Sequence, residues 1–92
     1  MGVMSDASLA AAKADPEVVR VLLGRAVQRY GSQAKLAAAC DVKQASIWQA
    51  IHSGQTSAEL AVKIEAATAG DVPATELRPD LPWPALKQAV GA

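Results

Sequence analysis

The chain has 92 residues, with nine basic and nine acidic side chains, and therefore no formal net charge at pH 7. Its length fits one domain, and no apolar run approaches the roughly 18 residues that a membrane span needs, which excludes a membrane protein. The single cysteine excludes an intrachain disulfide, so we expect a reduced, cytoplasmic setting.

The apolar residues favour helices over strands. They make up 51% of the chain, but only 3% of all residues are aromatic, and alanine is the commonest residue. Alanine enters a helix without losing side-chain entropy, whereas strands favour β-branched and aromatic residues. Because no segment alternates between apolar and polar residues, the sequence predicts an all-α fold, a compact bundle of four to five helices.

The first helix signal follows an alanine-rich stretch, residues 1–14, which we expect to be a flexible arm. Asp15 can cap a helix, Pro16 suits its first position, and Glu17 suits its positive end. Gly31 can end this helix in the left-handed conformation. The apolar face predicted between these limits carries Val19, Leu22, Leu23, Ala26, Val27 and Tyr30.

Two short helices are predicted next. Ser32 is positioned to cap a helix over residues 33–40, and Gly54 is positioned to end another over residues 43–52. Residues 41 and 42 form a tight break between them. The inward faces of these two helices carry Leu36, Ala37 and Cys40 in the first, and Ile47, Ala50 and Ile51 in the second.

A fourth helix follows. Thr56 and Glu59 have the spacing of a capping box, which predicts where this helix begins, and Gly70 closes it. Its inward face carries Leu60, Ala61, Ile64, Ala67 and Thr68.

The end of the chain is predicted to be mostly irregular. A short helical turn over residues 72–77 is followed by prolines that forbid a long helix over residues 78–84. We therefore expect one folded domain over residues 15–84 and a tail over residues 85–92. The residues expected to close the core, or in part to form a dimer surface, are Leu77, Leu81, Trp83 and Leu86, with Arg78 and Asp80 paired at the edge.

The two short helices carry the most specific pattern in the chain. Ala37 is small, as it must be where a second helix crosses closely over the first. Asp41 lies in the turn, where a positive φ is required that Asp tolerates better than most residues. Val42 and Ile47 fill the space between the helices. This pattern is typical of a helix-turn-helix, whose second helix enters the major groove of DNA.

Two stretches resemble a known family. Residues 32–44 read SQAKLAAACDVKQ, and residues 57–68 and 76–81 read SAELAVKIEAAT and ELRPDL. They resemble the Cro/C1-type helix-turn-helix superfamily and, within it, the small YdaS-like (Cro-like) regulators of phages and prophages. The resemblance covers residues 20–84 and implies a lambda-repressor-like DNA-binding fold.

The chain departs from this family at two positions. Asp41 stands where the family prefers glycine in the turn. Ala50 stands where a tryptophan is common late in the third helix, and Trp48 lies two residues earlier. These departures leave the predicted fold unchanged and bear on the tilt of the third helix.

The helix predicted over residues 43–52 offers a polar surface to DNA. At about 100° per residue, the side opposite its apolar residues carries Ala45, Gln49 and His52. Glutamine amides suit bidentate bonds to adenine, a lysine suits a guanine edge or a phosphate, and an alanine leaves room for a thymine methyl. The DNA contacts predicted from this region are Lys43, Gln44, Ala45, Ser46, Trp48, Gln49 and His52.

Further contacts are expected outside that helix. Ser32 and Gln33 begin the preceding helix, whose N–H groups favour phosphate. The family resemblance implies that Gln33 braces Gln44. Arg29 is interpreted either as a phosphate clamp or as a solvated residue, and Trp48 either touches DNA or packs against the preceding helix as part of the core.

The uneven distribution of charge is compatible with a nucleic-acid partner. Residues 16–54 hold five basic and two acidic side chains, whereas residues 55–92 hold three basic and five acidic ones. A positive half can dock on phosphate although the whole chain is neutral. Because one small domain contacts few bases, we expect a homodimer that binds double-stranded operator DNA and represses transcription.

Two rival functions make different demands. An enzyme needs a cluster of reactive groups, but Cys40 falls on an inward helix face and His52 lies near a helix end. No metal-ligand spacing or glycine-rich phosphate loop occurs either, so we expect neither catalysis nor a cofactor. The stronger rival is a protein-interaction module, antitoxin-like or RNA polymerase-binding, which would use the same helices to bind a toxin or another phage or host protein. The zero net charge also fits this module.

Overall fold

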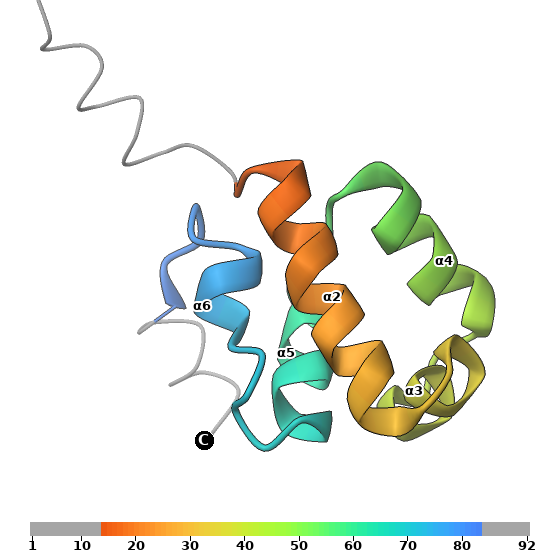
Figure 1. The fold of residues 1–92 in the computed structure, drawn as a ribbon. Helices are drawn as coiled ribbons and strands as arrows, with labels where there is room; N and C mark the ends of the chain where they lie inside the picture. The colour runs from red at the N-terminus through yellow and green to blue at the C-terminus, as the bar shows by residue number, and fades with distance from the viewer. Residues whose placement is uncertain (1–13, 84–92) are drawn as a thin grey trace, which may run out of the picture.

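The computed structural model describes residues 14–83, and all regular elements among them are helical (Figure 1). The predicted all-α bundle is confirmed, while the predicted tail and all but the last residue of the predicted arm lie outside the described residues. No helix of the described part is both long and apolar enough to cross a membrane. The helices are α2 (Pro16–Tyr30), α3 (Gln33–Cys40), α4 (Gln44–Ser53), α5 (Ala58–Ala67) and α6 (Ala74–Leu77).

Helix α2 begins and ends where the local sequence predicts. The Asp15 carboxylate accepts a hydrogen bond of 2.8 Å from the N–H of Glu17, and Pro16 occupies the first turn. Gly31 adopts φ 93°, a left-handed conformation that glycine enters without a Cβ penalty, and its N–H donates to the carbonyl of Val27. These caps satisfy backbone groups that a helix end otherwise leaves unpaired.

Helix α3 also has its predicted bounds, whereas α4 is shifted by one residue from the predicted range. The Ser32 hydroxyl accepts a 3.1 Å bond from the N–H of Lys35, which confirms the predicted cap of α3. Lys43 has an extended backbone (φ −77°, ψ 149°) and precedes α4 without a side-chain cap, because lysine carries no acceptor. Gly54 ends α4 at φ 72°, as predicted.

The predicted capping box of α5 is wrong by one position. The residue that caps α5 is Ser57, whose hydroxyl accepts a 3.0 Å bond from the N–H of Leu60. Thr56 is instead buried, at 5% exposure, and its Oγ1 has no hydrogen-bond partner among residues 14–83. Two adjacent hydroxyl residues both satisfy the local capping pattern, and packing against the rest of the fold selects between them.

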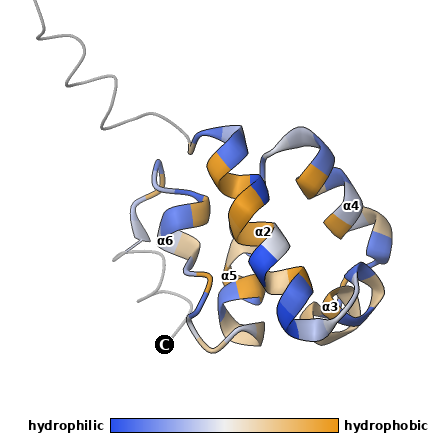
Figure 2. Ribbon diagram, viewed as in Figure 1, coloured by the Kyte–Doolittle hydropathy of each residue, from blue (hydrophilic) through white to orange (hydrophobic). Residues whose placement is uncertain are grey.

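The core lies between α2 and the helices around it. Figure 2 shows the apolar bands of α4 on the side that faces α2. Ile47 of α4 and Leu36 of α3 are fully buried there, together with Leu23 of α2. The buried apolar residues are Val19, Leu22, Leu23, Ala26, Leu36, Ala37, Cys40, Ile47, Ala50, Leu60, Ala61, Ile64, Val72, Ala74, Leu77 and Trp83.

The segment after α5 closes the core through polar contacts as well as apolar ones. The Glu65 carboxylate accepts a 2.7 Å bond from the N–H of Ala74 and so caps α6 from another helix. Arg78 and Asp80 form the predicted pair, through two bonds of 2.9 Å, and this bonding raises the pKa of the Arg78 guanidinium. Trp83 is 4% exposed, as expected of a residue that closes the core, and Leu86 lies outside the described residues.

Candidate nucleic-acid interface

The turn between α3 and α4 fixes how the two helices meet. Asp41 has φ 58° and ψ 46°, which confirms the predicted left-handed position. The N–H of Asp41 donates to the carbonyl of Ala38, and the N–H of Val42 donates to that of Ala37. Val42 is half-buried and packs against the core, while Ile47 is fully buried. Because these contacts hold α4 by its inner side, the opposite side of α4 is left exposed.

The other end of α4 is held by α2. The Arg20 guanidinium donates two bonds of 2.9 Å, one to the carbonyl of Ile51 and one to that of His52. These carbonyls lie in the last turn of α4, where a helix lacks internal donors and a positive charge is favourable. Arg20 also pairs with Glu17 at 2.6 Å. This role of Arg20 could not be read from local sequence, because its partners lie more than 30 residues away in the chain.

Gly54 is the second contact between α2 and the end of α4. A Cβ built on Gly54 would lie 2.5 Å from the Cβ of Pro16 and 2.8 Å from its Cα, so only glycine fits. The sequence predicts Gly54 as a helix end through its positive φ. The close approach to Pro16 is a separate, tertiary reason for glycine at this position.

The outer side of α4 presents a mixed surface. Ile47 and Ala50 face inward as predicted, and Ile51 is half-buried. Ser46 is also half-buried, at the border between the two sides. The exposed residues that begin or lie on this surface are Lys43, Gln44, Ala45, Trp48, Gln49 and His52.

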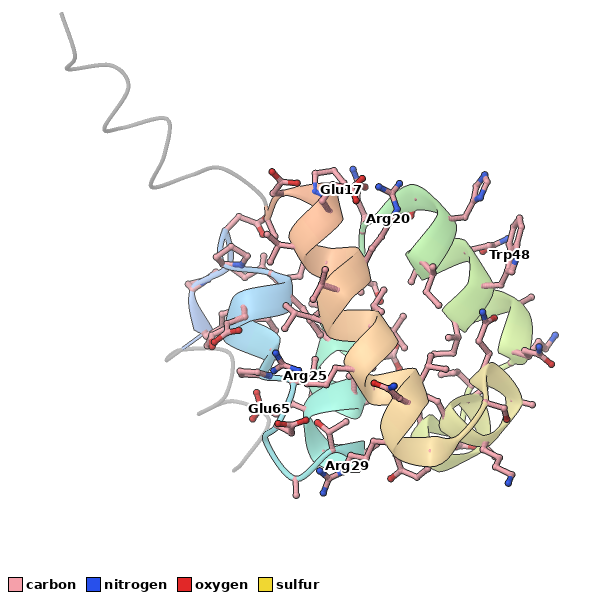
Figure 3. The ribbon with its side chains drawn as sticks, viewed as in Figure 1. Glu17, Arg20, Arg25, Arg29, Trp48 and Glu65 are labelled. Atoms are coloured by element: carbon pink, nitrogen blue, oxygen red, sulfur yellow. The ribbon has the colours of Figure 1, made fainter. Side chains whose placement is uncertain are left out.

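Trp48 lies on this outer side and not in the core (Figure 3). It is 53% exposed, so the alternative in which it packs against the preceding helix is wrong. Its ring stacks on that of His52, one helical turn later, with centroids 4.7 Å apart and planes 9° from parallel. The stack holds a flat, rigid surface on α4 that can lie against a sugar or a base.

The N-terminus of α3 places Ser32 and Gln33 at the surface, both half-exposed. The Ser32 hydroxyl accepts from the N–H of Lys35, so the N–H groups of Gln33 and Ala34 are the ones left in the first turn to bind an anion. Among the described residues no hydrogen bond joins Gln33 to Gln44, so the brace implied by the family resemblance stays a prediction. Arg29 is exposed at the end of α2 that leads to α3, and Figure 3 shows it well apart from Trp48.

A polar groove runs beside the outer side of α4, between α4 and the start of α5. It has a volume of about 530 Å³. Ser46, Gln49 and Ser53 line it from α4, and Lys63 lines it from α5. Lys63 pairs with Glu59 at 3.5 Å, so one positive charge of the groove is already balanced within the chain. No local sequence pattern predicts this groove, since it arises where two separate helices meet.

Cys40 and His52 lie in different surroundings. Cys40 is 3% exposed, and burial raises the pKa of its thiol, although Lys63 has a smaller opposite effect. His52 lies on the exposed side of α4, and no hydrogen bond joins the two. Residues 14–83 contain no group of three or more His, Cys, Asp or Glu side chains arranged to hold a metal ion.

Comparison with known proteins identifies one family. The family model described as "Bacterial toxin YdaS" matches residues 23–86, which is more than half of the 92 residues. The matched segment begins within α2 and contains α3, α4, α5 and α6. Neither the curated proteins nor the solved structures gave a match to the chain.

Proposed function

The chain belongs to the YdaS family of bacterial toxins, and we propose that it is a sequence-specific regulator of transcription that binds double-stranded DNA. In this proposal it belongs to the Cro/C1-type helix-turn-helix superfamily and acts as a Cro-like repressor. The observation that carries the proposal is the outer side of α4. It is exposed and rich in amide and ring groups, while the inner side is fixed by α2 and α3.

The side chains on α4 match the edges of bases in the major groove. Gln44 and Gln49 each offer a donor and an acceptor that fit adenine N6 and N7. Lys43 is suited to a guanine edge or a phosphate, and Ala45 leaves space for a thymine methyl. Trp48, stacked on His52, contacts a sugar or a thymine methyl.

Phosphate contacts would place α4 in the groove. The N-terminus of α3, at Ser32 and Gln33, points N–H groups toward an anion. Arg29, exposed in the last turn of α2, would add a backbone contact without base preference. A homodimer that sets two α4 helices in successive major grooves would then occlude a promoter.

Selection of bound duplexes from a random pool, followed by affinity measurements on the selected sites, tests this proposal. Gln44→Ala should cost about 1–3 kcal/mol of binding free energy and relax the preference at one base position. Arg29→Ala should weaken all sequences alike and lower the slope of affinity against salt by about one unit. Equal losses from both variants on every sequence, or a pool without enriched sites, would contradict the proposal.

A protein-interaction module is the second candidate, because the chain is neutral overall. The family description is compatible with both functions, since occluding promoters and capturing a host protein both harm a cell. Salt dependence separates them. Each phosphate contact contributes about 0.9 to the slope of log affinity against log salt, so a DNA complex weakens steeply. A salt-insensitive complex with a protein, without retardation of DNA, favours the module.

A further inference from the structure

The outer face of α2 carries two exposed valines that do not pack in the core of the described fold. Val21 is 65% exposed and Val18 is 50% exposed. Gly24 follows Val21 by three residues, on the same side of the helix. A Cβ added at Gly24 would meet nothing within 4 Å. Glycine inside an exposed helix costs about 1 kcal/mol relative to alanine. Nothing in residues 14–83 requires that cost, which points to a contact made with another molecule.

The spacing of this face makes it complementary to itself. Glu17, Val21, Gly24 and Gln28 follow one another at intervals of four, three and four residues, which is one stripe of a helix. Read backward, the stripe has the same intervals, so an antiparallel copy sets Val21 opposite Gly24 and Glu17 opposite Gln28. A symmetric dimer needs this relation, in which residue i contacts j and j contacts i.

The shapes of the paired positions fit. A shallow hollow of about 670 Å³ lies along this face, lined by Val21, Gly24, Arg25 and Gln28 together with Val27 and Gly31. Because Gly24 has no side chain, there is open space above it, and Val21 of a second copy would fill that space. At each end of the stripe, the Gln28 amide can donate to the Glu17 carboxylate, whose side chain is 78% exposed and whose Oε1 stays open among the described residues while Oε2 accepts from Arg20.

The charges favour the antiparallel arrangement over the parallel one. Glu17 lies at the beginning of α2, and Arg25 lies two turns later. The one hydrogen bond of Arg25 within residues 14–83 is a long one, 3.4 Å to the carbonyl of Asp71. In the antiparallel register Arg25 lies one helical turn from Glu17 of the second copy and level with its Arg20, whose charge Glu17 already balances, whereas a parallel copy opposes Arg25 to Arg25 and Glu17 to Glu17.

The position of α4 relative to α2 agrees with this arrangement. In Figure 1, α2 runs down the front of the bundle and α4 lies to its right. A two-fold axis that lies in the contact plane and crosses α2 at a right angle makes the two α2 helices antiparallel. Such an axis leaves both α4 helices on the same side of the dimer, whereas an axis along α2 would turn them to opposite sides.

We propose that the chain forms a symmetric dimer through the outer face of α2, with the stripe Glu17, Val21, Gly24 and Gln28 packed antiparallel against the same stripe of a second copy. This inference deepens the proposed function, whose homodimer it supplies with a surface. The contact itself needs no DNA, so it is tested in the absence of DNA.

Sedimentation equilibrium of the full chain measures the association directly. Gly24→Leu fills the space over the stripe at two symmetric places, and overpacking costs about 1–3 kcal/mol at each, so the dissociation constant should rise at least about 30-fold. Its thermal unfolding at low concentration should stay the same or improve, because leucine is a better helix former than glycine. Ala66→Leu, the same side chain added at an exposed position of α5, is the control and should leave the dimer intact.

Charge reversal tests the antiparallel register. Glu17→Arg and Arg25→Glu should each raise the dissociation constant by about 2- to 30-fold, because each exposed pair occurs twice in the dimer. Combining both reversals should restore the dimer. A chain that is monomeric at every concentration, or a Gly24→Leu variant that dimerises like the wild type, overturns this inference and leaves DNA binding by α4 untouched. Loss of DNA binding with an intact dimer overturns the proposed function instead.

Discussion

Arg20 is predicted to hold the last turn of α4 in place, and Arg20→Met tests this. Methionine keeps much of the apolar stem of arginine but has no N–H donors. The substitution therefore removes the two bonds to the carbonyls of Ile51 and His52 and leaves the stem packing largely intact. The ion pair with Glu17 is lost as well, but it joins exposed side chains and contributes little.

The expected loss follows from the contacts. A hydrogen bond to a charged group contributes about 1.5–3 kcal/mol when it is buried. The Arg20 side chain is 35% exposed, so water competes for both carbonyls and screens the charge. We therefore expect Arg20→Met to lower the free energy of unfolding by about 1–2 kcal/mol in total. Arg20→Lys, whose ammonium cannot span both carbonyls in a fixed plane, should lose about half as much.

Urea unfolding gives the loss of stability, and amide hydrogen exchange locates it. The N–H of Gly54, which donates to the carbonyl of Ala50 at the end of α4, should exchange faster in Arg20→Met. Arg29→Met is the matched control, since Arg29 is exposed in the last turn of α2, and it should stay within about 0.5 kcal/mol of the wild type. Equal stability of the two variants, with unchanged exchange at Gly54, would refute the anchoring role of Arg20.

Substitutions at Gly54, Cys40 and Glu65 test three further contacts of the fold. Gly54→Ala should cost about 2 kcal/mol more than Gly70→Ala in urea unfolding, because both positions have a positive φ but only the first brings a Cβ against Pro16. Burial raises the pKa of the Cys40 thiol, so the stability it contributes is present below its unfolded pKa of about 8.5 and is lost as pH rises through the folded value. Cys40→Ala is expected to be less stable than the wild type at neutral pH. Its free energy of unfolding should nevertheless fall less than that of the wild type between neutral and alkaline pH, and an identical fall would contradict this. Glu65→Ala should lower stability by about 1 kcal/mol by removing the acceptor of the Ala74 N–H, whereas Glu65→Gln keeps an oxygen there and most of the stability, as thermal unfolding will show.

Local signals in the sequence predict most of the helix boundaries. Asp15 and Pro16 begin α2, Ser32 begins α3, and Gly31 and Gly54 end helices through left-handed conformations. These features act within one or two turns of the backbone, so the sequence around each position contains the whole cause. The left-handed turn at Asp41 was predictable for the same reason.

Contacts between distant residues could not be predicted in this way. Arg20 bonds to carbonyls of α4, and the Glu65 carboxylate caps α6, nine residues later in the chain. Neither spacing belongs to a known local motif, so neither contact could be recognised from the sequence. The choice of Ser57 over Thr56 as a cap depends on which of them the fold buries. The helical wheel likewise left Trp48 between two faces, and its exposure depends on how α4 is tilted against α2 and α3.

The two tryptophans give this small protein two separate optical reporters. Trp83 lies in the interior, so its emission follows the loss of packing when the chain unfolds. Trp48 sits in water on α4, stacked on an imidazole that can quench it, so its emission follows events at that surface. Replacing one indole at a time by phenylalanine would let a single fluorimeter distinguish unfolding from the arrival of a ligand.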